Sequence, residues 1–215
     1  MSKVLIIVEG IADVIFLRDY IKFLKSNCVV KNENLKKNKY LLIEIDDIEI
    51  KILIGGGYTA LNKLSSRIQE YIDSGYKVAV IQDADDITKE NGTKANRMEY
   101  LDSVKEKSNI DFKTFLFPNH NDDGDLETLL LKIQDTIQYN LADKCYINYI
   151  ECCSKISHQD YSDELSTDKS KVFNYFRTYY GMQSAKEENR MYEIKYWDFN
   201  HIALDELKKF LGEYL

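Results

Sequence analysis

The segment KVAVIQDADD, residues 77–86, begins as an apolar run and ends in three carboxylates within four positions. Its apolar part is rich in β-branched residues, which is typical of a strand buried on both faces, as in a parallel sheet. Like charges this close repel one another and disfavour their own ionised forms. Either solvent or a cation must therefore offset the repulsion among Asp83, Asp85 and Asp86. The rest of the fold decides which of the two does so.

The same order of a strand followed by a helix recurs along the first half of the chain. KVLIIV (3–8) predicts a second buried strand, with a helix from Asp13 onward. Two strand-like runs, 40–45 and 48–54, indicate a hairpin, and a helix is expected over about 95–107 before a strand at 112–117. This alternation predicts an α/β fold, a doubly wound and mostly parallel sheet with helices on both faces.

The remainder of the chain reads mainly as helix. Helical segments are expected at 125–139, 142–155, 168–180 and 200–213, with polar connections at 158–167 and 181–191. We therefore expect an α/β core over residues 1–135 and a helical C-terminal elaboration over 136–215 that packs on it. Aromatic residues are frequent in this second part, and we expect most of them in its core rather than at an interface (Tyr139, Tyr146, Tyr149, Phe173, Tyr175, Phe176, Tyr179, Tyr180).

Composition restricts the class of protein. Hydrophobic residues make up 44% and charged residues 30% of the chain, and no apolar run approaches the roughly 20 residues of a membrane span. The apolar start is too short for a signal sequence, so a cytoplasmic location is expected. The four cysteines lack metal-binding or paired spacing and are expected to be buried, reduced thiols (Cys28, Cys145, Cys152, Cys153).

Charge argues against a protein that coats nucleic acid indiscriminately. The formal net charge is −7, whereas phosphate binding needs clustered Lys and Arg. Lysines do gather in residues 31–40 and 168–171, and each run favours a solvated face over a nucleic-acid patch. The net negative charge does not exclude a basic groove in one part of the surface.

The acidic residues follow the predicted strand ends. Glu9 follows the first strand, Asp83 to Asp86 follow the strand at 77–83, and a further group follows the strand at 112–117 (Asp122, Asp123, Asp125, Glu127). Ligands of open α/β sheets bind at the carboxyl ends of the strands. Oxygen donors without convergent His or Cys favour Mg²⁺ or Mn²⁺ over zinc.

Simpler roles compete for several of these residues. Asp125 and Glu127 suit the first turn of a helix, where a cap and the helix dipole favour negative charge, and Asp13 also suits a helix start. Asp83 and Asp85 favour a metal, because alternate residues leaving a strand project to one side. Residues 55–57, a glycine triplet, indicate a tight turn at least as much as a phosphate loop.

The order of these motifs resembles the TOPRIM (topoisomerase-primase) fold. That fold carries a Glu after its first strand and Asp-x-Asp after its third, matched by VEGIAD (8–13) and DADD (83–86). The chain resembles more closely a small stand-alone family of uncharacterised bacterial TOPRIM-like proteins, related to the nuclease domain of overcoming-lysogenization-defect (OLD) proteins. The matching segments are FLFPNHNDDGDLETLLL (115–131), DKSKVFNYF (168–176) and YWDFNHIALDELKKFL (196–211).

The resemblance implies metal-dependent phosphodiester chemistry on nucleic acid, DNA in preference to RNA. Asp83 and Asp85 would bind Mg²⁺ or Mn²⁺, with Glu9 as ligand or general base and the remaining acids completing the shell (Asp13, Asp86, Glu127). Related nucleases place a lysine near the scissile phosphate, and Lys169 and Lys171 are the candidates, each of which also fits a plain helix surface. No ATPase sequence accompanies the match as in OLD proteins, so a separate ATPase partner is compatible with this chain.

Two other function classes remain open at this point. One is a non-catalytic metal-binding or nucleic-acid-binding module that serves as the sensor or effector subunit of a phage-defence or toxin system. The other is a phosphotransfer domain of the receiver or haloacid-dehalogenase type, which would need paired acids or Asp-x-Asp on the first strand. Only Glu9 stands there, so this option ranks last.

Overall fold

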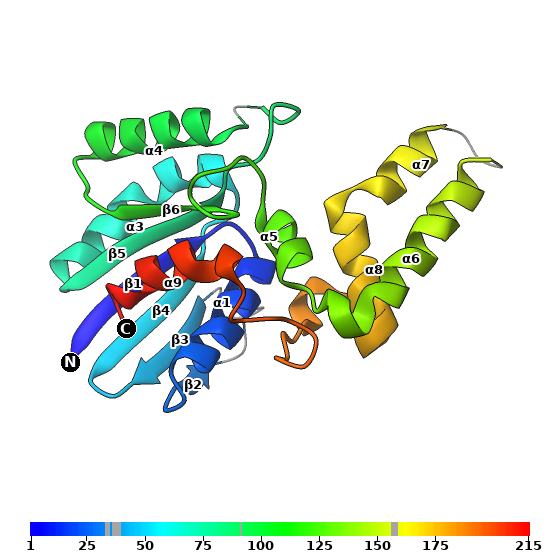
Figure 1. Cartoon of the computed structure of the whole chain (residues 1–215). Coiled ribbons are helices and arrows are strands. Elements are labelled where there is room, and N and C mark those ends of the chain that lie inside the picture. The colour runs from blue at the N-terminus through cyan, green and yellow to red at the C-terminus, as the bar shows by residue number, and fades with distance from the viewer. Residues whose placement is uncertain (33–34, 36–39, 91, 156–158) are drawn as a thin grey trace.

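The computed structural model describes residues 1–32, 35, 40–90, 92–155 and 159–215. Within this part the chain forms one six-stranded sheet in the order β2-β3-β4-β1-β5-β6 (Figure 1). The strands are β1 (Ser2–Val8), β2 (Val29–Asn32), β3 (Tyr40–Ile45), β4 (Ile48–Ile54), β5 (Tyr76–Asp83) and β6 (Lys113–Phe117). Strands β4, β1, β5 and β6 are parallel, and β3 pairs antiparallel with both β4 and β2. The predicted α/β fold with a mostly parallel sheet is therefore present.

Helices cover both faces of this sheet because its central strand is apolar on both sides. Alternate residues of β1 enter two separate cores, Val4, Ile6 and Val8 on one face and Leu5 and Ile7 on the other. Helices α1 (Ile11–Leu24), α5 (Leu126–Ile133) and α9 (Asp205–Gly212) pack on the first face, and α3 (Leu61–Asp73) and α4 (Lys94–Ser108) on the second. Figure 1 shows the two layers on opposite sides of the strands.

The register brings the ends of the parallel strands to one edge. Val8 pairs with Ile54 across β1 and β4, and Asp83 pairs with Phe117 across β5 and β6. Glu9, Gly55 and Ala84 are thus the first residues beyond their strands at the same edge. This edge is where the predicted acidic residues converge.

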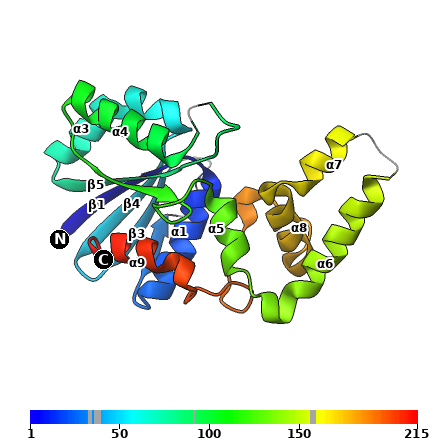
Figure 2. The ribbon, with the colours of Figure 1, turned by 45° about the horizontal axis from the view of Figure 1, so that its top comes forward.

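The middle of the C-terminal half forms a lobe that projects from the sheet. It consists of α6 (Thr136–Cys153), α7 (Gln159–Ser166) and α8 (Asp168–Tyr180), and both Figure 1 and Figure 2 show it standing beside α5. Buried Tyr175 and Phe176 of α8 join the core through Trp197. After short 3₁₀ turns at Glu187–Asn189 and Ile202–Leu204, the chain returns to the sheet as α9. A third 3₁₀ turn, Tyr58–Ala60, precedes α3.

Several local features differ from the expectations. The segment expected as one helix at 125–139 is divided, because α5 ends at Ile133 and α6 begins at Thr136. Residues 159–166 form helix α7 instead of a polar connection, because their few apolar residues hide the helical period. The strand β2 was not expected, since four residues at a sheet edge, with Val29 half exposed, carry little pattern. The cysteines are free, but Cys145 and Cys152 are exposed, so burial holds only for Cys153 and in part for Cys28.

Candidate functional site

The carboxyl edge of the sheet gathers four carboxylates from three segments. Glu9 follows β1, Asp13 lies in the first turn of α1, Asp83 ends β5, and Glu127 lies in the first turn of α5. Asp83 experiences the charges of the other three, and Asp13 those of Glu9 and Glu127. We call these four residues the acidic site.

Glu9 and Asp13 are held by the turn between β1 and α1. The Glu9 Oε1 atom accepts a hydrogen bond from the Asp83 backbone N–H at 3.3 Å, which ties the ends of β1 and β5 together. Asp13 Oδ2 accepts one from the Gly10 backbone N–H at 2.8 Å, the helix-start role that its sequence position suggested. Asp13 is only 7% exposed, and burial raises its pKa to about 7. Burial also raises the pKa of Glu9, against the charge of Arg97.

Asp83 faces the start of helix α5. Its Oδ1 atom accepts a hydrogen bond from the Leu126 backbone N–H at 3.0 Å, one of the N–H groups that a helix leaves unpaired at its N-terminus. Burial, followed by the charges of Asp13 and Glu9, raises the pKa of Asp83 well above its usual value. The helix terminus thus offsets only part of the repulsion at this carboxylate.

The two acids at the start of α5, Asp125 and Glu127, differ in their contacts. Asp125 is the N-cap, because its Oδ1 accepts the Thr128 backbone N–H at 2.8 Å, as predicted. Glu127 is 8% exposed and contacts the guanidinium of buried Arg190, with Oε1 at 3.6 Å from Nη1. Burial and the charge of Asp125 raise the pKa of Glu127, while Arg190 and Lys169 oppose the shift. Glu127 is therefore more than a helix-start residue.

Asp85 does not follow the strand direction that was expected to align it with Asp83. Strand β5 ends at Asp83, and Asp85 has a left-handed φ of 56° in a bridge with Gly124. Its carboxylate forms an ion pair with Arg97, which is 2% exposed. The argument from strand alternation was wrong for Asp85, because alternation ends with the strand.

Asp86 lies outside the acidic site. Its exposed carboxylate accepts hydrogen bonds from the side chain and the backbone N–H of Thr88, and these bonds lower its pKa. The loop then closes at Gly92, where a Cβ would lie 1.9 Å from the Asp86 carbonyl oxygen. Asp86 stabilises a loop, and nothing in its contacts supports a metal role.

The glycine triplet forms a turn. The Gly55 and Gly56 N–H groups donate to the carbonyl oxygens of Val8 and Glu9 at 2.7 and 3.1 Å. These two donors are engaged within the protein instead of facing a phosphate. Gly56 and Gly57 have φ of 88° and 90°, which explains the residue type.

Of the two candidate lysines, Lys169 is the one associated with the acidic site. Its charge acts on Glu127, and its Nζ lies 3.4 Å from Glu187 Oε1. Lys171 instead pairs with Asp168 of its own helix at 3.3 Å. The other lysine run, 31–40, includes residues 33–34 and 36–39, which lie outside the described residues.

The donor chemistry of the acidic site suits a hard divalent cation. All four groups offer carboxylate oxygens, and burial raises the pKa of each of them. A nearby cation would lower these pKa values again. Within the described residues, however, no three His, Cys, Asp or Glu side chains already converge as metal ligands. The carboxylates are gathered at one edge but are not arranged as a complete coordination shell.

Two buried arginines were not predicted at all. Arg97 neutralises Asp85 from α4, and Arg190 neutralises Glu127 from the segment before Tyr192. Each is 2% exposed, which is rare for arginine without an acidic partner. No local pattern marks either arginine as buried: Arg97 lies in the helix expected at about 95–107, and Arg190 in a stretch that reads as a polar connection.

Comparison with known proteins adds a family without an assigned role. The family model described as "Protein of unknown function (DUF3226)" matches residues 3–215. No curated protein matches the sequence. A crystal structure of hypothetical protein PH0156 from Pyrococcus horikoshii OT3 is similar at 16% identity, with a TM-score of 0.47, covering 100% of this chain and 95% of that one. Among the described residues, no helix is both long and apolar enough to cross a bilayer.

Proposed function

The chain belongs to this family of unknown function, and we propose that it is a TOPRIM-type protein that hydrolyses phosphodiester bonds in nucleic acid with a divalent metal ion. The acidic site carries the proposal. It gathers four carboxylates at the carboxyl edge of an α/β sheet, where burial and then the charges of the other three and of Asp125 raise the pKa of Asp83. DNA is the favoured substrate over RNA, and a separate ATPase partner belongs to the same proposal.

Glu9, Asp83 and Glu127 would hold Mg²⁺ or Mn²⁺, with Asp13 beside them. When bound, the ion would lower the pKa of a water and stabilise charge on the attacking and leaving oxygens. Glu9 has a raised pKa, which makes its carboxylate a better acceptor for a proton from that water. Lys169, near Glu127, would attract the substrate phosphate.

The test is a cleavage assay with the purified chain. Labelled single-stranded DNA, duplex DNA and RNA are incubated with Mg²⁺ or Mn²⁺, and the products are separated on a denaturing gel. Asp83→Asn and Glu9→Gln are expected to lower the rate by about 100-fold or more, because each removes a charged group at the reacting centre. Asp102→Asn, an exposed acid on α4, is the control and should cleave like the parent. Undiminished cleavage by both site variants would contradict the assignment.

A second candidate is a binding module that keeps the metal without catalysis. It is favoured by the absence of a converged ligand set among the described residues and by the pairing of Asp85 and Glu127 with buried arginines. In this case the parent shows no cleavage, yet Mn²⁺ raises its melting temperature and leaves that of Asp83→Asn unchanged. Loss of the Mn²⁺ effect in Glu127→Gln would assign Glu127 as a ligand.

A further inference from the structure

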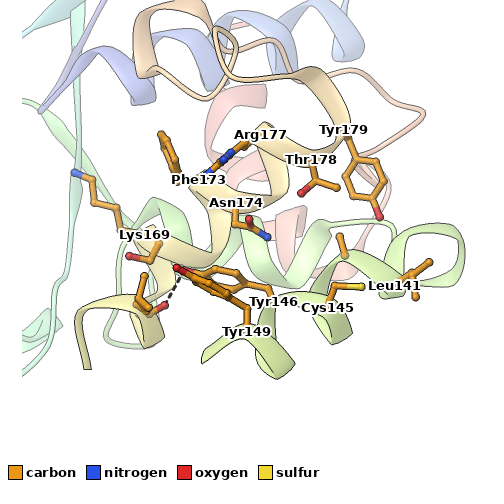
Figure 3. Close-up of a pocket in the computed structure, with 13 residues that line it drawn as sticks. Leu141, Cys145, Tyr146, Tyr149, Lys169, Phe173, Asn174, Arg177, Thr178 and Tyr179 are labelled. Carbon is orange, nitrogen blue, oxygen red and sulfur yellow. Dashed lines mark hydrogen bonds between the residues drawn. The ribbon is translucent and has the colours of Figure 1, made fainter. Parts of the chain in front are cut away.

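A groove in the helical lobe lies outside the acidic site. It has a volume of about 780 Å³ and runs between α6 and α8. Figure 3 shows Tyr146 and Tyr149 of α6 on one side and Phe173 and Asn174 of α8 on the other. Lys169 stands at one end and Tyr179 at the other. We call this cavity the lobe groove.

Two aromatic side chains of the groove are exposed to solvent. Tyr149 is 48% and Phe173 40% exposed, whereas Phe176, one turn along α8, is fully buried against Trp197. Tyr146 is fixed by a hydrogen bond from its hydroxyl to the Leu165 carbonyl oxygen at 3.0 Å, and its ring stacks with that of Tyr149 at 6.1 Å between centroids. Tyr149 and Phe173 therefore present exposed ring surface in the groove, and Tyr146 holds the ring of Tyr149 in place.

The charged residues that line the groove are basic, although Lys169 also pairs with Glu187, which is not among the lining residues. The formal net charge of the protein is −7, yet among the described residues that line the groove none is acidic. Lys169 and Arg177 are both exposed there. Exposed aromatic rings interleaved with cations match a ligand that combines flat bases with phosphates.

One end of the groove leads to the acidic site. Lys169 lines the groove, and its charge also acts on Glu127. The Thr128 hydroxyl of α5 lies 3.4 Å from Asp168 Oδ2 at the start of α8, so the two helix starts are neighbours. At ~1.5 Å per residue, α8 separates Lys169 from Tyr179 by about 15 Å along the groove.

We infer that the lobe groove binds single-stranded nucleic acid and leads it to the acidic site. Bases stack on Tyr149 and Phe173, while Arg177 and Lys169 contact phosphates. A duplex hides the faces of its bases, so only an unpaired strand can use these rings. The inference rests on the proposed function for its substrate class and adds the strand type and the residues that hold it.

The test measures binding in EDTA, where metal-dependent cleavage is absent. Fluorescence anisotropy follows a labelled 12-nucleotide single strand of DNA and the matching blunt duplex. The parent is expected to prefer the single strand, and Phe173→Ala or Tyr149→Ala to weaken binding about ten-fold or more. Arg177→Gln should reduce the slope of log K against log salt by about 0.7.

Two exposed residues outside the groove serve as matched controls. Arg67→Gln on α3 removes a surface arginine, and Ile202→Ala removes a side chain that is 78% exposed. Both should bind like the parent, and melting temperatures of all variants check that they are folded. Absent binding by the parent, equal affinity for the duplex, or unchanged affinity in the groove variants overturns the inference.

The outcomes separate this inference from the proposed function. A parent that binds the single strand through the groove but never cleaves it in Mg²⁺ supports the groove and contradicts hydrolysis. A parent that cleaves in Mg²⁺ while the groove variants bind and cleave normally overturns the groove alone.

Discussion

The acidic site and the lobe groove hold opposite kinds of side chain in opposite surroundings. The acidic site presents carboxylates that are buried or half-buried, with pKa values raised by that burial and with arginine partners that are 2% exposed. The lobe groove presents the rings of Tyr149 and Phe173, which are 48% and 40% exposed, and two exposed cations, Lys169 and Arg177, without acidic lining residues in the described part of the chain.

Under the two proposals, one chain separates two tasks. The charges of the acidic site lie at the end of a sheet, where strands and helix starts define the position of each side chain. The surface proposed to bind a flexible strand lies on a projecting lobe, where its side chains are exposed to solvent. Substitutions in the first region should therefore change stability, and those in the second should leave it nearly unchanged.

The largest contrast is expected between two phenylalanines on the same helix. Phe176 is fully buried, so Phe176→Ala should lower the free energy of unfolding by about 3–5 kcal/mol. Phe173→Ala removes a ring that is 40% exposed and should change it by less than about 1 kcal/mol. Urea denaturation followed by circular dichroism measures both. Equal losses would mean that Phe173 belongs to the core of the lobe.

The next effect is a pH dependence that comes from Asp13. Its pKa is about 7 in the folded chain and 3.8 in the unfolded one, so between these values the folded state holds a proton that the unfolded state has released. Stability contributed by this proton is complete below about pH 4 and is lost as pH rises through 7. At 1.36 kcal/mol per pKa unit, the loss amounts to about 4 kcal/mol at most.

Asp13→Asn tests this dependence, because its amide oxygen can still accept the Gly10 N–H. In EDTA, parent and variant should unfold at similar urea concentrations near pH 4, and the variant should become the more stable as pH rises to 8. The stability of the variant should still fall somewhat as pH rises, because the pKa values of Glu9, Asp83 and Glu127 are also raised in the folded state. Parallel pH profiles for the two proteins would contradict the assignment to Asp13.

The smallest of these effects compares two arginines. Arg97→Met leaves the Asp85 carboxylate without its buried partner and should cost about 2 kcal/mol, below the usual range for buried pairs because Asp85 is 20% exposed. Arg177→Met in the lobe groove removes an exposed cation and should cost less than about 0.5 kcal/mol. Thermal unfolding of both variants, in low and high salt, measures the difference. A loss of stability in Arg177→Met as large as that in Arg97→Met would show that Arg177 contributes to the stability of the fold, contrary to this prediction.

Part of the acidic site could be predicted from local pattern. Glu9 and Asp83 each end a buried apolar run, so their placement at the carboxyl edge followed from strand direction alone. Asp125 follows a glycine and precedes an apolar helix, which identified it as a cap. These features depend on residues next to them in the chain.

Other parts depended on contacts between distant segments. Asp85 itself has a left-handed φ beyond the end of β5, and its carboxylate pairs with Arg97. No rule of residue spacing predicts that φ. Arg190 reads as a loop residue until Glu127 is packed against it. Phe173 and Phe176 look alike in the sequence, and only the position of Trp197 decides which of them is buried.

The sequence by itself determined the α/β class, the strands that end in Glu9 and Asp83, and the helices that follow them, because backbone geometry converts local apolar spacing into those elements. Only the tertiary structure decided which charges are neutralised and which aromatic rings stay exposed. Burial and charge pairing are properties of three-dimensional neighbours, and in this chain the neighbours that matter come from α4, α5, α8 and the segment around Arg190.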